Sequence, residues 1–512
     1  LELSSKETLE QLSIEENELN LQINDFLKSL KDKYPKYHRL KYQNITAQAK
    51  DIQRIFDLQK QHQYELGNTT ASQRLAKLNR LHQAVLKYRP QIKEALFKDY
   101  RKHPSEVDLT EIYPVTSEIK HAKRNIHSWM SSKRVSTPLA LMGSSSRVVY
   151  EPKGVVLLIS PWNFPVNLTL GPLVSAIAAG NTVMIKPSEM TPNASAVMKE
   201  LLGEVFEEKE IAVLEGGIST STELLKLPFN HIFFTGAPSI GKIVMKAAAE
   251  HLSSVTLELG GKSPTIVDET ANVDTAARRI AWGKFVNNGQ VCIAPDYLFV
   301  HESKQEEFMS AFKKYMSAFY SEDASKESSY ARIVNGKHYN RVKGYVDDAL
   351  SKGAKMEAGG KFDESQDYIA PTLMTNVSKD SKLMTQEIFG PVLPVFSFNN
   401  IDKVIEEINS REKPLALYIY SSKKKNINYI LSNTRAGGSC INHNAAHFFN
   451  SNLPFGGSNN SGIGKAHGHA GFLEFSNERG LFKQHMPNAL ELLMPPYNDF
   501  KQKLIDLTIK WF

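Results

Sequence analysis

Cys292 is one of only two cysteines in the 512-residue chain, and its neighbours differ from those of a typical core thiol. It lies in the sequence NNGQVCIAPD (residues 287–296), where Gly289 and small or polar residues stand in place of an apolar run. A thiolate is a strong nucleophile, and a tight backbone turn can expose it to a substrate. Free cysteines are more often interior, so an inert buried thiol is the alternative interpretation. A catalytic role requires a base and an oxyanion donor from elsewhere in the chain.

Two other segments offer those groups. Glu258 lies within the apolar sequence Leu257–Leu259, and burial there would raise the pKa of its carboxyl group toward the range of a general base. The alternative is a glutamate on the solvent face of an edge strand. Asn163 lies in SPWNFP (residues 160–165), and its amide could donate to a developing oxyanion. The alternative for Asn163 is a turn-capping side chain.

Three further segments could bind a nucleotide cofactor. Residues 234–242 join a predicted strand to a predicted helix, and the glycines and the helix N-terminus suit a phosphate, although the G-x-G-x-x-G pattern is absent. Lys186 and Glu189 follow a predicted strand, where ligands bind in open α/β sheets, and could hydrogen-bond a ribose. Glu387 and Phe389 precede another strand and could contact a cofactor ring or ribose. A plain turn, an exposed charged loop and a loop-closing segment are the respective alternatives.

The elements that must position these residues follow an alternating pattern. Apolar, strand-like runs alternate with helix-like segments from about residue 146 onward, which predicts βαβ units and a mostly parallel sheet. The predicted strands are 155–159, 183–185, 211–214, 232–234 and 255–259, and the predicted helices are 173–179, 194–202, 223–227 and 240–252. A second α/β stretch covers about 264–430, with strands at 297–300 and 393–396. Residues 1–135 are polar and helical in period, and 438–486 is expected to be rich in loops.

Composition excludes several classes of protein. Hydrophobic content of 41% and charged content of 23% are typical of a globular protein, and the length predicts more than one domain. Two cysteines exclude a disulfide scaffold and favour a reducing, cytoplasmic setting. The net charge of +7 is scattered among acidic residues, which favours a solvated mixed surface over nucleic-acid binding. No apolar run is long enough for a membrane span, and the first residues lack the apolar region of a signal peptide. The sequence opens with Leu1, so removal of an upstream segment is also considered.

Seven motifs together resemble the aldehyde dehydrogenase superfamily. SPWNFP, IKPSE, FTGAPSIG, LELGGKSP, GQVCIAPDY, EIFGPV and LPFGG occur in the order that this family shows, between about residues 46 and 486. GQVCIAPDY and the sequence Pro495–Tyr497 are most similar to the class 3 branch, which acts on fatty, aromatic and coniferyl-type aldehydes. The resemblance implies an α/β fold with a Rossmann-type NAD(P)-binding domain, an α/β catalytic domain and a small oligomerisation arm.

The resemblance also implies roles for the residues that match. Cys292 resembles the nucleophile and Glu258 the general base, while Asn163 and the backbone N–H of Cys292 resemble the oxyanion hole. The implied cofactor is NAD, with NADP possible, and no metal is implied. Its expected contacts are Lys186 and Glu189 at the adenosine ribose, Gly236, Ser239 and Gly241 at the phosphates, Leu259, and Glu387 and Phe389 near the nicotinamide ribose. A CoA-acylating or reductive relative and an inactive homologue are the competing readings, and Glu258 favours water as the acyl acceptor.

The implied domain plan has five parts. These are a helical extension (1–45), an NAD(P)-binding domain (46–259), a catalytic domain (260–437), an oligomerisation and substrate-tunnel segment (438–486) and an amphipathic tail (487–512). An arm segment at about 131–150 belongs to the second part, and a homodimer is expected. In the tail, apolar Phe500, Leu504, Leu507 and Trp511 are spaced for a helix that packs on its own or a partner subunit, with a membrane-surface anchor as the alternative. The tunnel sequence 442–452 mixes aromatic and polar residues and does not distinguish a fatty from an aromatic aldehyde.

Overall fold

The computed structural model describes residues 35–487 and 489–511, and the side chains of residues 48–487 and 490–511. The extension expected for residues 1–45 therefore lies almost entirely outside the described residues. The chain divides after Ile55 into two units, and the first is represented only by the beginning of helix α2 (Pro35–Gly67). The second unit comprises residues 56–512.

A six-stranded sheet confirms the predicted βαβ pattern. Its strand order is β17-β7-β6-β3-β4-β5, and all neighbours are parallel except β17 and β7. The order reverses between β3 and β6, and ligands of open α/β sheets bind outside the carboxyl ends of strands at such a point. The strands are β3 (Val155–Ile159), β4 (Thr182–Lys186), β5 (Ile211–Val213), β6 (His231–Gly236), β7 (Ser254–Leu259) and β17 (Gly462–Ile463), and the helices are α7 (Asn167–Ala179), α8 (Pro192–Val205), α9 (Ile218–Leu224) and α10 (Pro238–Ala249).

A seven-stranded sheet forms the second α/β layer. Its order is β10-β13-β14-β9-β8-β15-β16, with β10 alone antiparallel to its neighbour. Strand β16 (Gly438–Ile441) belongs to this sheet, so the boundary expected at 437/438 falls inside it rather than at its edge. The other strands are β8 (Pro264–Val267), β9 (Tyr297–His301), β10 (Lys355–Ala358), β13 (Thr372–Thr375), β14 (Val392–Phe398) and β15 (Ala416–Tyr420). The helices are α11 (Val273–Phe285), α12 (Gln305–Tyr320), α13 (Gly336–Ser351), α14 (Lys382–Thr385), α15 (Ile401–Asn409) and α16 (Lys424–Asn433).

The polar N-terminal part is helical, as its period predicts. It comprises α3 (Ala71–Lys87), α4 (Arg89–Tyr100), α5 (Pro104–Val107), a π-helical turn (Asp108–Ile112) and α6 (Tyr113–Met130). Thr70 and Gln73 form a capping box at the start of α3, which satisfies free N–H groups of its first turn. Leu78, Leu81 and Val85 face inward and are fully buried in the core that α3 shares with α7 and α8.

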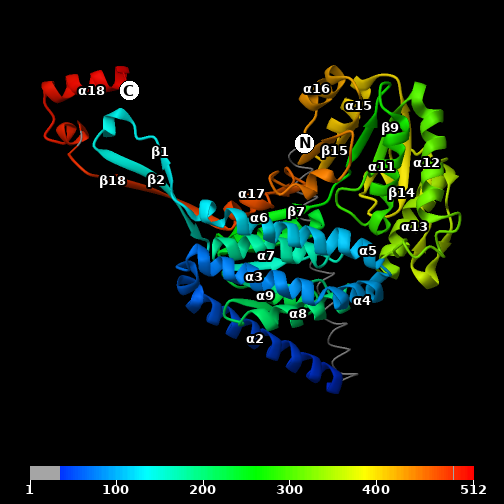
Figure 1. The fold of residues 1–512 in the computed structure, drawn as a ribbon, viewed down its shortest axis with the longest axis horizontal. Helices are drawn as coiled ribbons and strands as arrows, with labels where there is room; N and C mark the ends of the chain where they lie inside the picture. Colours follow the sequence, from blue (N-terminus) through cyan, green and yellow to red (C-terminus); the bar gives the residue numbers. More distant parts are fainter. Residues whose placement is uncertain (1–34, 488, 512) are drawn as a thin grey trace, which may run out of the picture. The chain divides into compact units, whose positions relative to one another are not determined.

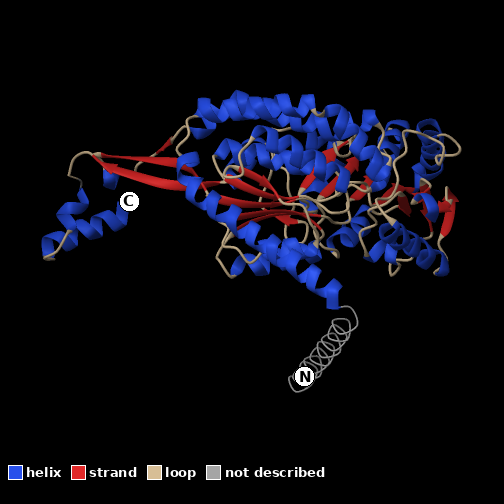
Figure 2. Cartoon of the chain, turned by 90° about the horizontal axis from the view of Figure 1, so that it is seen from below, coloured by secondary structure: helices blue, strands red, loops and turns tan. Residues whose placement is uncertain are grey.

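The expectation of a loop-rich segment at 438–486 is wrong at its C-terminal end. Strand β18 (Ser476–Gln484) pairs along the whole of β2 (Ser144–Pro152), which also pairs with β1 (Lys133–Val135). The three strands form a ribbon that starts beside α17 (Gly468–Glu474) and ends away from both large sheets (Figures 1 and 2). The sequence SNERGLFKQ does not alternate between apolar and polar residues, and its last eight residues are exposed, so no buried face revealed the strand.

The predicted C-terminal helix is present as α18 (Asp499–Trp511). Phe500, Leu507 and Trp511 are exposed on it. Among the residues that the structure describes, no helix is long and apolar enough to cross a membrane.

A buried ion pair joins the N-terminal helices to the loop after β3. Lys102 and Glu111 are fully buried, with 3.0 Å between Nζ and Oε1, and Lys102 Nζ lies 4.1 Å from the ring centroid of Phe164. Glu111 also accepts the backbone N–H of Asn167 at 2.8 Å. Lys102→Met should lower the free energy of unfolding by about 3–5 kcal/mol, because it leaves a buried carboxyl group without its cation. Urea unfolding would measure this, and a loss below about 1 kcal/mol, typical of an exposed pair, would contradict it.

Candidate active site

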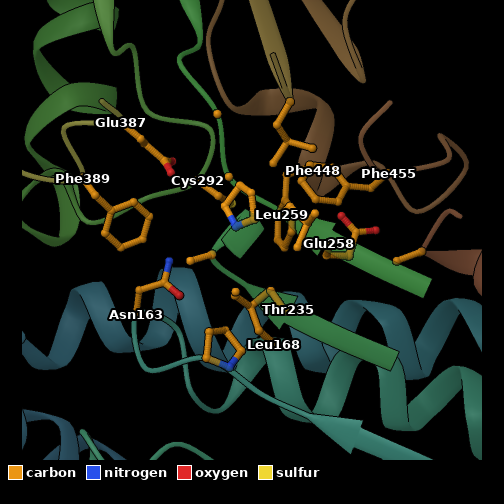
Figure 3. Close-up of a pocket in the computed structure, with 18 of the residues that line it drawn as sticks. Asn163, Leu168, Thr235, Glu258, Leu259, Cys292, Glu387, Phe389, Phe448 and Phe455 are labelled. Carbon is orange, nitrogen blue, oxygen red and sulfur yellow. The ribbon is translucent and has the colours of Figure 1, made fainter. Parts of the chain in front are cut away.

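One cavity of about 1090 Å³ lies at the carboxyl ends of β3, β6 and β7, where it is also lined by the second sheet's loops (Figure 3). Eight of the eleven residues predicted for the site line it: Asn163, Gly236, Ser239, Glu258, Leu259, Cys292, Glu387 and Phe389. Lys186, Glu189 and Gly241 do not line it. Residues separated by more than 200 positions are thus brought to one space by the two sheets.

Cys292 is positioned by an unusual backbone turn after α11. Asn287, Asn288 and Gly289 all have positive φ angles, of 52°, 55° and 72°. A Cβ atom on Gly289 would overlap the carbonyl oxygen of Gly390, so only glycine allows this approach. The turn therefore places Cys292 on the cavity wall next to the loop that carries Phe389.

The Cys292 thiol is partly exposed to the cavity but lies in a poorly solvated place. Burial, with smaller contributions from the carboxyl groups of Glu387 and Glu258, raises the pKa of Cys292 to about 12. The backbone N–H groups of Cys292 and Ile293 act in the opposite direction, because they face the sulfur. The sulfur is thus a neutral thiol at neutral pH, and it needs a proton acceptor or an added positive charge to react.

Asn163 is held by hydrogen bonds that leave part of its amide available. The side-chain Nδ2 of Asn163 donates to the backbone carbonyl oxygen of Gln290 at 3.0 Å. The backbone carbonyl oxygen of Asn163 accepts from the Tyr100 hydroxyl (3.0 Å) and from Asn287 Nδ2 (2.9 Å). An amide nitrogen has two N–H donors, so one remains for a ligand. In Figure 3 this nitrogen points to the side of the cavity where Cys292 lies. Sequence reasoning missed Gln290 and Asn287 as supports, although both belong to the Cys292 motif.

Glu258 is buried rather than solvent-facing. Only 6% of the residue is exposed, and neither carboxyl oxygen has a hydrogen-bond partner among the described residues. Burial raises the pKa of Glu258 well above its usual value, while Lys465 lowers it and Glu474 raises it. Strand β17 covers the outer edge of β7 with Gly462 opposite Glu258, so the predicted edge-strand alternative does not hold.

The opposite end of the cavity carries Glu387 and Phe389. A Cβ atom on Gly260 would overlap the Glu387 carboxyl group, which shows how closely this side chain lies to the backbone after β7. Burial, with a contribution from Asp296, raises the pKa of Glu387 to about 8. Phe389 packs edge-on against Trp162 at 5.3 Å between ring centroids. Arg341 fixes this loop by donating to the carbonyl oxygen of Ile388 at 2.8 Å.

A phosphate-sized group could lie at the start of α10. Residues 235–239 line the cavity where β6 ends and this 12-residue helix begins. The first N–H groups of a helix lack internal partners and carry partial positive charge. Gly241 lies behind this wall, where a Cβ atom would come within 2.8 Å of Leu259, so its glycine serves packing.

Lys186 and Glu189 lie at the end of β4, outside the cavity. Lys186 Nζ donates to Glu189 Oε2 at 2.7 Å and to the carbonyl oxygen of Pro187 at 2.9 Å. Lys186 is buried and the Glu189 side chain is 43% exposed. The pair is therefore preformed, with the carboxylate facing outward next to the sheet edge.

Aromatic side chains line the third side of the cavity. Phe448 and Phe455 lie at the opposite end of Figure 3 from Glu387 and Phe389. Phe449 packs against both Phe448 and Tyr113, with ring centroids 5.8 and 6.2 Å apart, and all of them line the cavity. The expected tunnel segment 442–452 contributes Phe448, Phe449 and Ser451. His467, whose φ is 73°, also lines the cavity. It was not predicted from the sequence, because it lies in a loop and follows no helical or strand periodicity. Within the described part of the chain, no group of three or more His, Cys, Asp or Glu side chains could hold a metal ion.

Known proteins share both the sequence and the fold. The aldehyde dehydrogenase family profile matches residues 28–480, which begins earlier than the expected residue 46. The 4,4'-diaponeurosporen-aldehyde dehydrogenase of Staphylococcus aureus is 43% identical over 426 residues, which are 83% of this chain and 92% of that protein. Aldehyde dehydrogenase family 3 member A2 of Mus musculus is 42% identical over 430 residues, 84% of this chain and 88% of that protein. The substrate-bound state of Staphylococcus aureus AldH superposes with a TM-score of 0.85 at 40% identity, covering 90% of this chain and 99% of that one.

Proposed function

Because this chain belongs to the aldehyde dehydrogenase family, in its class 3 branch, we propose that Cys292, Glu258 and Asn163 carry its NAD(P)-dependent oxidation of an aldehyde to a carboxylic acid. One observation supports the assignment above all. A thiol, a buried carboxyl group without a partner and an amide N–H line one cavity, and they come from the turn after α11, the end of β7 and the loop after β3. An inactive homologue would have no need to keep the three together.

The cavity fits NAD(P) by its own geometry. The N-terminus of α10 provides N–H donors for the phosphates, and Glu387 and Phe389 lie where a nicotinamide ribose would reach toward Cys292. Leu259, at the end of β7, also lines the cavity. When bound, the nicotinamide ring supplies the chemistry of hydride acceptance and a positive charge near the sulfur.

The residues of the chain then act in order. The sulfur of Cys292 adds to the aldehyde carbon, its proton leaves to solvent, and the negative charge moves to the aldehyde oxygen. The free N–H of Asn163 and the backbone N–H of Cys292 stabilise that oxyanion. After oxidation the acyl group remains on Cys292 as a thioester. Glu258 takes a proton from water, whose oxygen attacks the thioester carbon, and the Cys292 sulfur leaves with the acid as product.

Asn163→Ala should lower kcat by about 10²–10³, the usual cost of removing one oxyanion donor. The KM for the cofactor should change little, because Asn163 lies away from the α10 turn. Steady-state kinetics would measure both. Trp162→Phe alters the neighbouring side chain without removing the amide, and an equal loss in that variant would show a packing effect instead.

We infer a fatty or aromatic aldehyde as the substrate. The wall formed by Tyr113, Phe448, Phe449 and Phe455 is apolar and large enough for a chain or ring. The similar Staphylococcus aureus protein is named for 4,4'-diaponeurosporen-aldehyde. This wall supports an apolar substrate without favouring a chain over a ring.

We infer a preference for NAD over NADP. The partly exposed Glu189 carboxylate would repel a 2′-phosphate, whereas buried Lys186 is already engaged. Glu189→Gln should therefore lower the KM for NADP by about 10-fold and leave the KM for NAD within about 2-fold, an effect of the size expected for one nearby charge. Separate titrations with each cofactor would measure this. Glu215→Gln, which removes another carboxylate near this edge, is the control, and an equal gain there would contradict a specific effect.

We propose that the chain forms a homodimer through residues 131–150 and 438–486. The ribbon of β1, β2 and β18 exposes Leu481 and Phe482, which a partner subunit would cover. The two cysteines of the chain, which form no disulfide bond, favour a reducing compartment such as the cytoplasm. Light scattering would measure the oligomeric state, and a monomer at micromolar concentration would contradict the dimer.

The function is tested by absorbance at 340 nm with NAD or NADP and a panel of medium-chain, long-chain and aromatic aldehydes, with and without CoA. A rising signal without CoA supports a hydrolytic dehydrogenase. A signal only with CoA would support the acyl-transferring alternative and remove the role given to Glu258. No signal with any aldehyde would support the inactive homologue.

A further inference from the structure

Two charged residues next to α17 lie against the strand that carries Glu258. Glu474 is the last residue of α17, and Lys465 lies in the loop that precedes this helix. The same loop contains β17, which pairs antiparallel with Leu257 and Glu258 of β7. The segment 456–474 therefore forms the outer cover of Glu258.

Glu474 ties this cover to β7 with both carboxyl oxygens. Oε1 accepts the backbone N–H of Lys465 at 2.9 Å, and Oε2 accepts the hydroxyl of Thr256 at 2.9 Å. Thr256 precedes Glu258 by two residues, so their side chains lie on the same face of the strand. A Cβ atom on Gly464, whose φ is 80°, would come within 2.8 Å of Glu474 Oε2. Glycine at 464 is thus required for Glu474 to approach.

Lys465 reaches Glu258 from the other side. Its Nζ donates to the carbonyl oxygens of Gly456 (2.7 Å) and Gly457 (3.0 Å), which uses two of the three donors of an ammonium group. A Cβ atom on Gly456 would lie 3.0 Å from Glu258 Oε1 and 3.1 Å from Lys465 Cδ. The Glu258 carboxyl group and the Lys465 side chain therefore meet across Gly456.

A chain of hydrogen bonds supports the charge on Glu474. When Thr256 donates to Glu474, its oxygen accepts from His231 Nε2 at 3.2 Å, and His231 Nδ1 accepts from Lys153 Nζ at 3.3 Å. This tautomer of His231 is inferred from the partners. Burial lowers the pKa of His231 well below its usual value, so the imidazole is neutral. His231 Nδ1 also lies 2.9 Å from Ser254 Oγ, and the Thr256 hydroxyl donates to Glu474, an arrangement that suits a carboxylate.

Other titratable groups near Glu258 carry no charge at neutral pH. Burial raises the pKa of Cys292 to about 12, which keeps the thiol neutral. Burial lowers the pKa of His467, on the same cavity wall, to about 4, which keeps the imidazole neutral. Lys465 and Glu474 are then the charges that act on Glu258, and they act in opposite directions: Lys465 lowers its pKa and Glu474 raises it.

We propose that Lys465 and Glu474 are positioning residues, an opposed pair that holds segment 456–474 against β7 and controls whether Glu258 is ionised when water must be activated. This inference rests on the proposed role of Glu258 as the base. Neither residue contacts the cavity's reacting atoms, and both act through Glu258.

The test follows hydrolysis of an acyl group on Cys292 without cofactor. p-Nitrophenyl acetate forms an S–acetyl bond to Cys292 and releases p-nitrophenol, and water then breaks that bond to give acetate and the free thiol. Loss of the acetyl adduct is followed by intact mass spectrometry across pH in the unmodified protein and in Lys465→Met, Glu474→Gln and the double variant. The acid limb of the rate should move to higher pH in Lys465→Met and to lower pH in Glu474→Gln, each by about one unit. The double variant should lie near the unmodified protein.

Several outcomes separate this inference from the proposed function. Shifts in the same direction, or no shift in Lys465→Met, would overturn the opposed pair, because a merely structural role predicts a lower rate at every pH. Lys465→Arg keeps the charge and should restore the profile; if Glu474→Gln fails to fold, the Lys465→Met and Lys465→Arg comparison decides alone. Glu258→Gln is the reference. Adduct loss that stays fast in Glu258→Gln would refute Glu258 as the base, whereas slow loss there with unshifted profiles in the other variants would refute only the opposed pair.

Discussion

Cys292→Ala should abolish aldehyde oxidation, with kcat falling on the order of 10⁶-fold, the scale seen when an enzyme loses its covalent nucleophile. The nearby carboxyl groups of Glu258 and Glu387 are poor substitutes for the sulfur, because burial raises their pKa values and favours the neutral acids. Binding of NAD should persist, since the α10 turn and the loop of Phe389 are unchanged. Absorbance at 340 nm measures the loss, and quenching of tryptophan fluorescence measures cofactor binding.

The chain supplies a matched control for this variant. Cys440, on β16, is the only other cysteine in the sequence, and its sulfur lies 3.1 Å from His447 Nδ1. Cys440→Ala removes the same atoms from a site that does not line the cavity, so kcat should stay within about 3-fold. Substantial activity in Cys292→Ala, or an equal loss in Cys440→Ala, would show that Cys292 is not the nucleophile.

The raised pKa of Cys292 has a mechanistic consequence. The sequence suggested a reactive thiolate because small and polar residues surround Cys292, yet burial keeps the thiol protonated in the cavity. The nearest charges that could help are negative, from Glu387 and Glu258, and they oppose ionisation. A positive ring that enters the space should therefore favour the thiolate, so that Cys292 reacts faster with the cofactor bound than in its absence.

The parts of the fold that sequence could predict are those with a period. Strands 155–159 and 255–259 were predicted within one residue, because the first is a continuous apolar run and the second has apolar residues at alternate positions. Strand β18 was not predicted, because eight of its nine residues are exposed and the strand is held by backbone hydrogen bonds. Such bonds do not require an alternation of apolar and polar residues in the sequence. The boundary expected at 437/438 lies just before β16, a strand of four residues in which only Cys440 is buried, so no apolar run indicated that the sheet continues there.

Candidate site residues could be predicted from the sequence where their own motif indicated a role. Residues that act through contacts with distant parts of the chain could not. Cys292, Glu258 and Asn163 were found because each residue type is unusual in its own motif. Gln290 and Asn287 act on Asn163 across more than 120 positions, and no periodicity reports such a contact. Lys465 and Glu474 look like ordinary surface charges in the sequence, and only the pairing of β17 with β7 brings them to Glu258.

Glu258→Gln should separate the two halves of the reaction. The amide matches the carboxyl group in shape but cannot accept a proton from water, so acylation of Cys292 should proceed while hydrolysis slows by about 10²–10⁴-fold, the usual contribution of a general base. An acyl-enzyme should then accumulate, with a burst of NADH close to one per active site followed by a slow phase. Stopped-flow absorbance measures the burst, and mass spectrometry identifies the adduct.

The pH dependence of the slow phase provides an independent check on the same residue. Burial raises the pKa of Glu258 well above its usual value, so the carboxyl group is protonated, and inactive as a base, at a higher pH than a solvated glutamate. Hydrolysis in the unmodified protein should therefore decline as pH falls through that raised value, and Glu258→Gln should lack this acid limb. Glu387→Gln is the comparison, because it removes a carboxyl group from the end of the cavity opposite Phe448. If hydrolysis stopped in Glu387→Gln while Glu258→Gln kept its acid limb, the base would be Glu387, and the water would have to approach Cys292 from the cofactor side of the cavity.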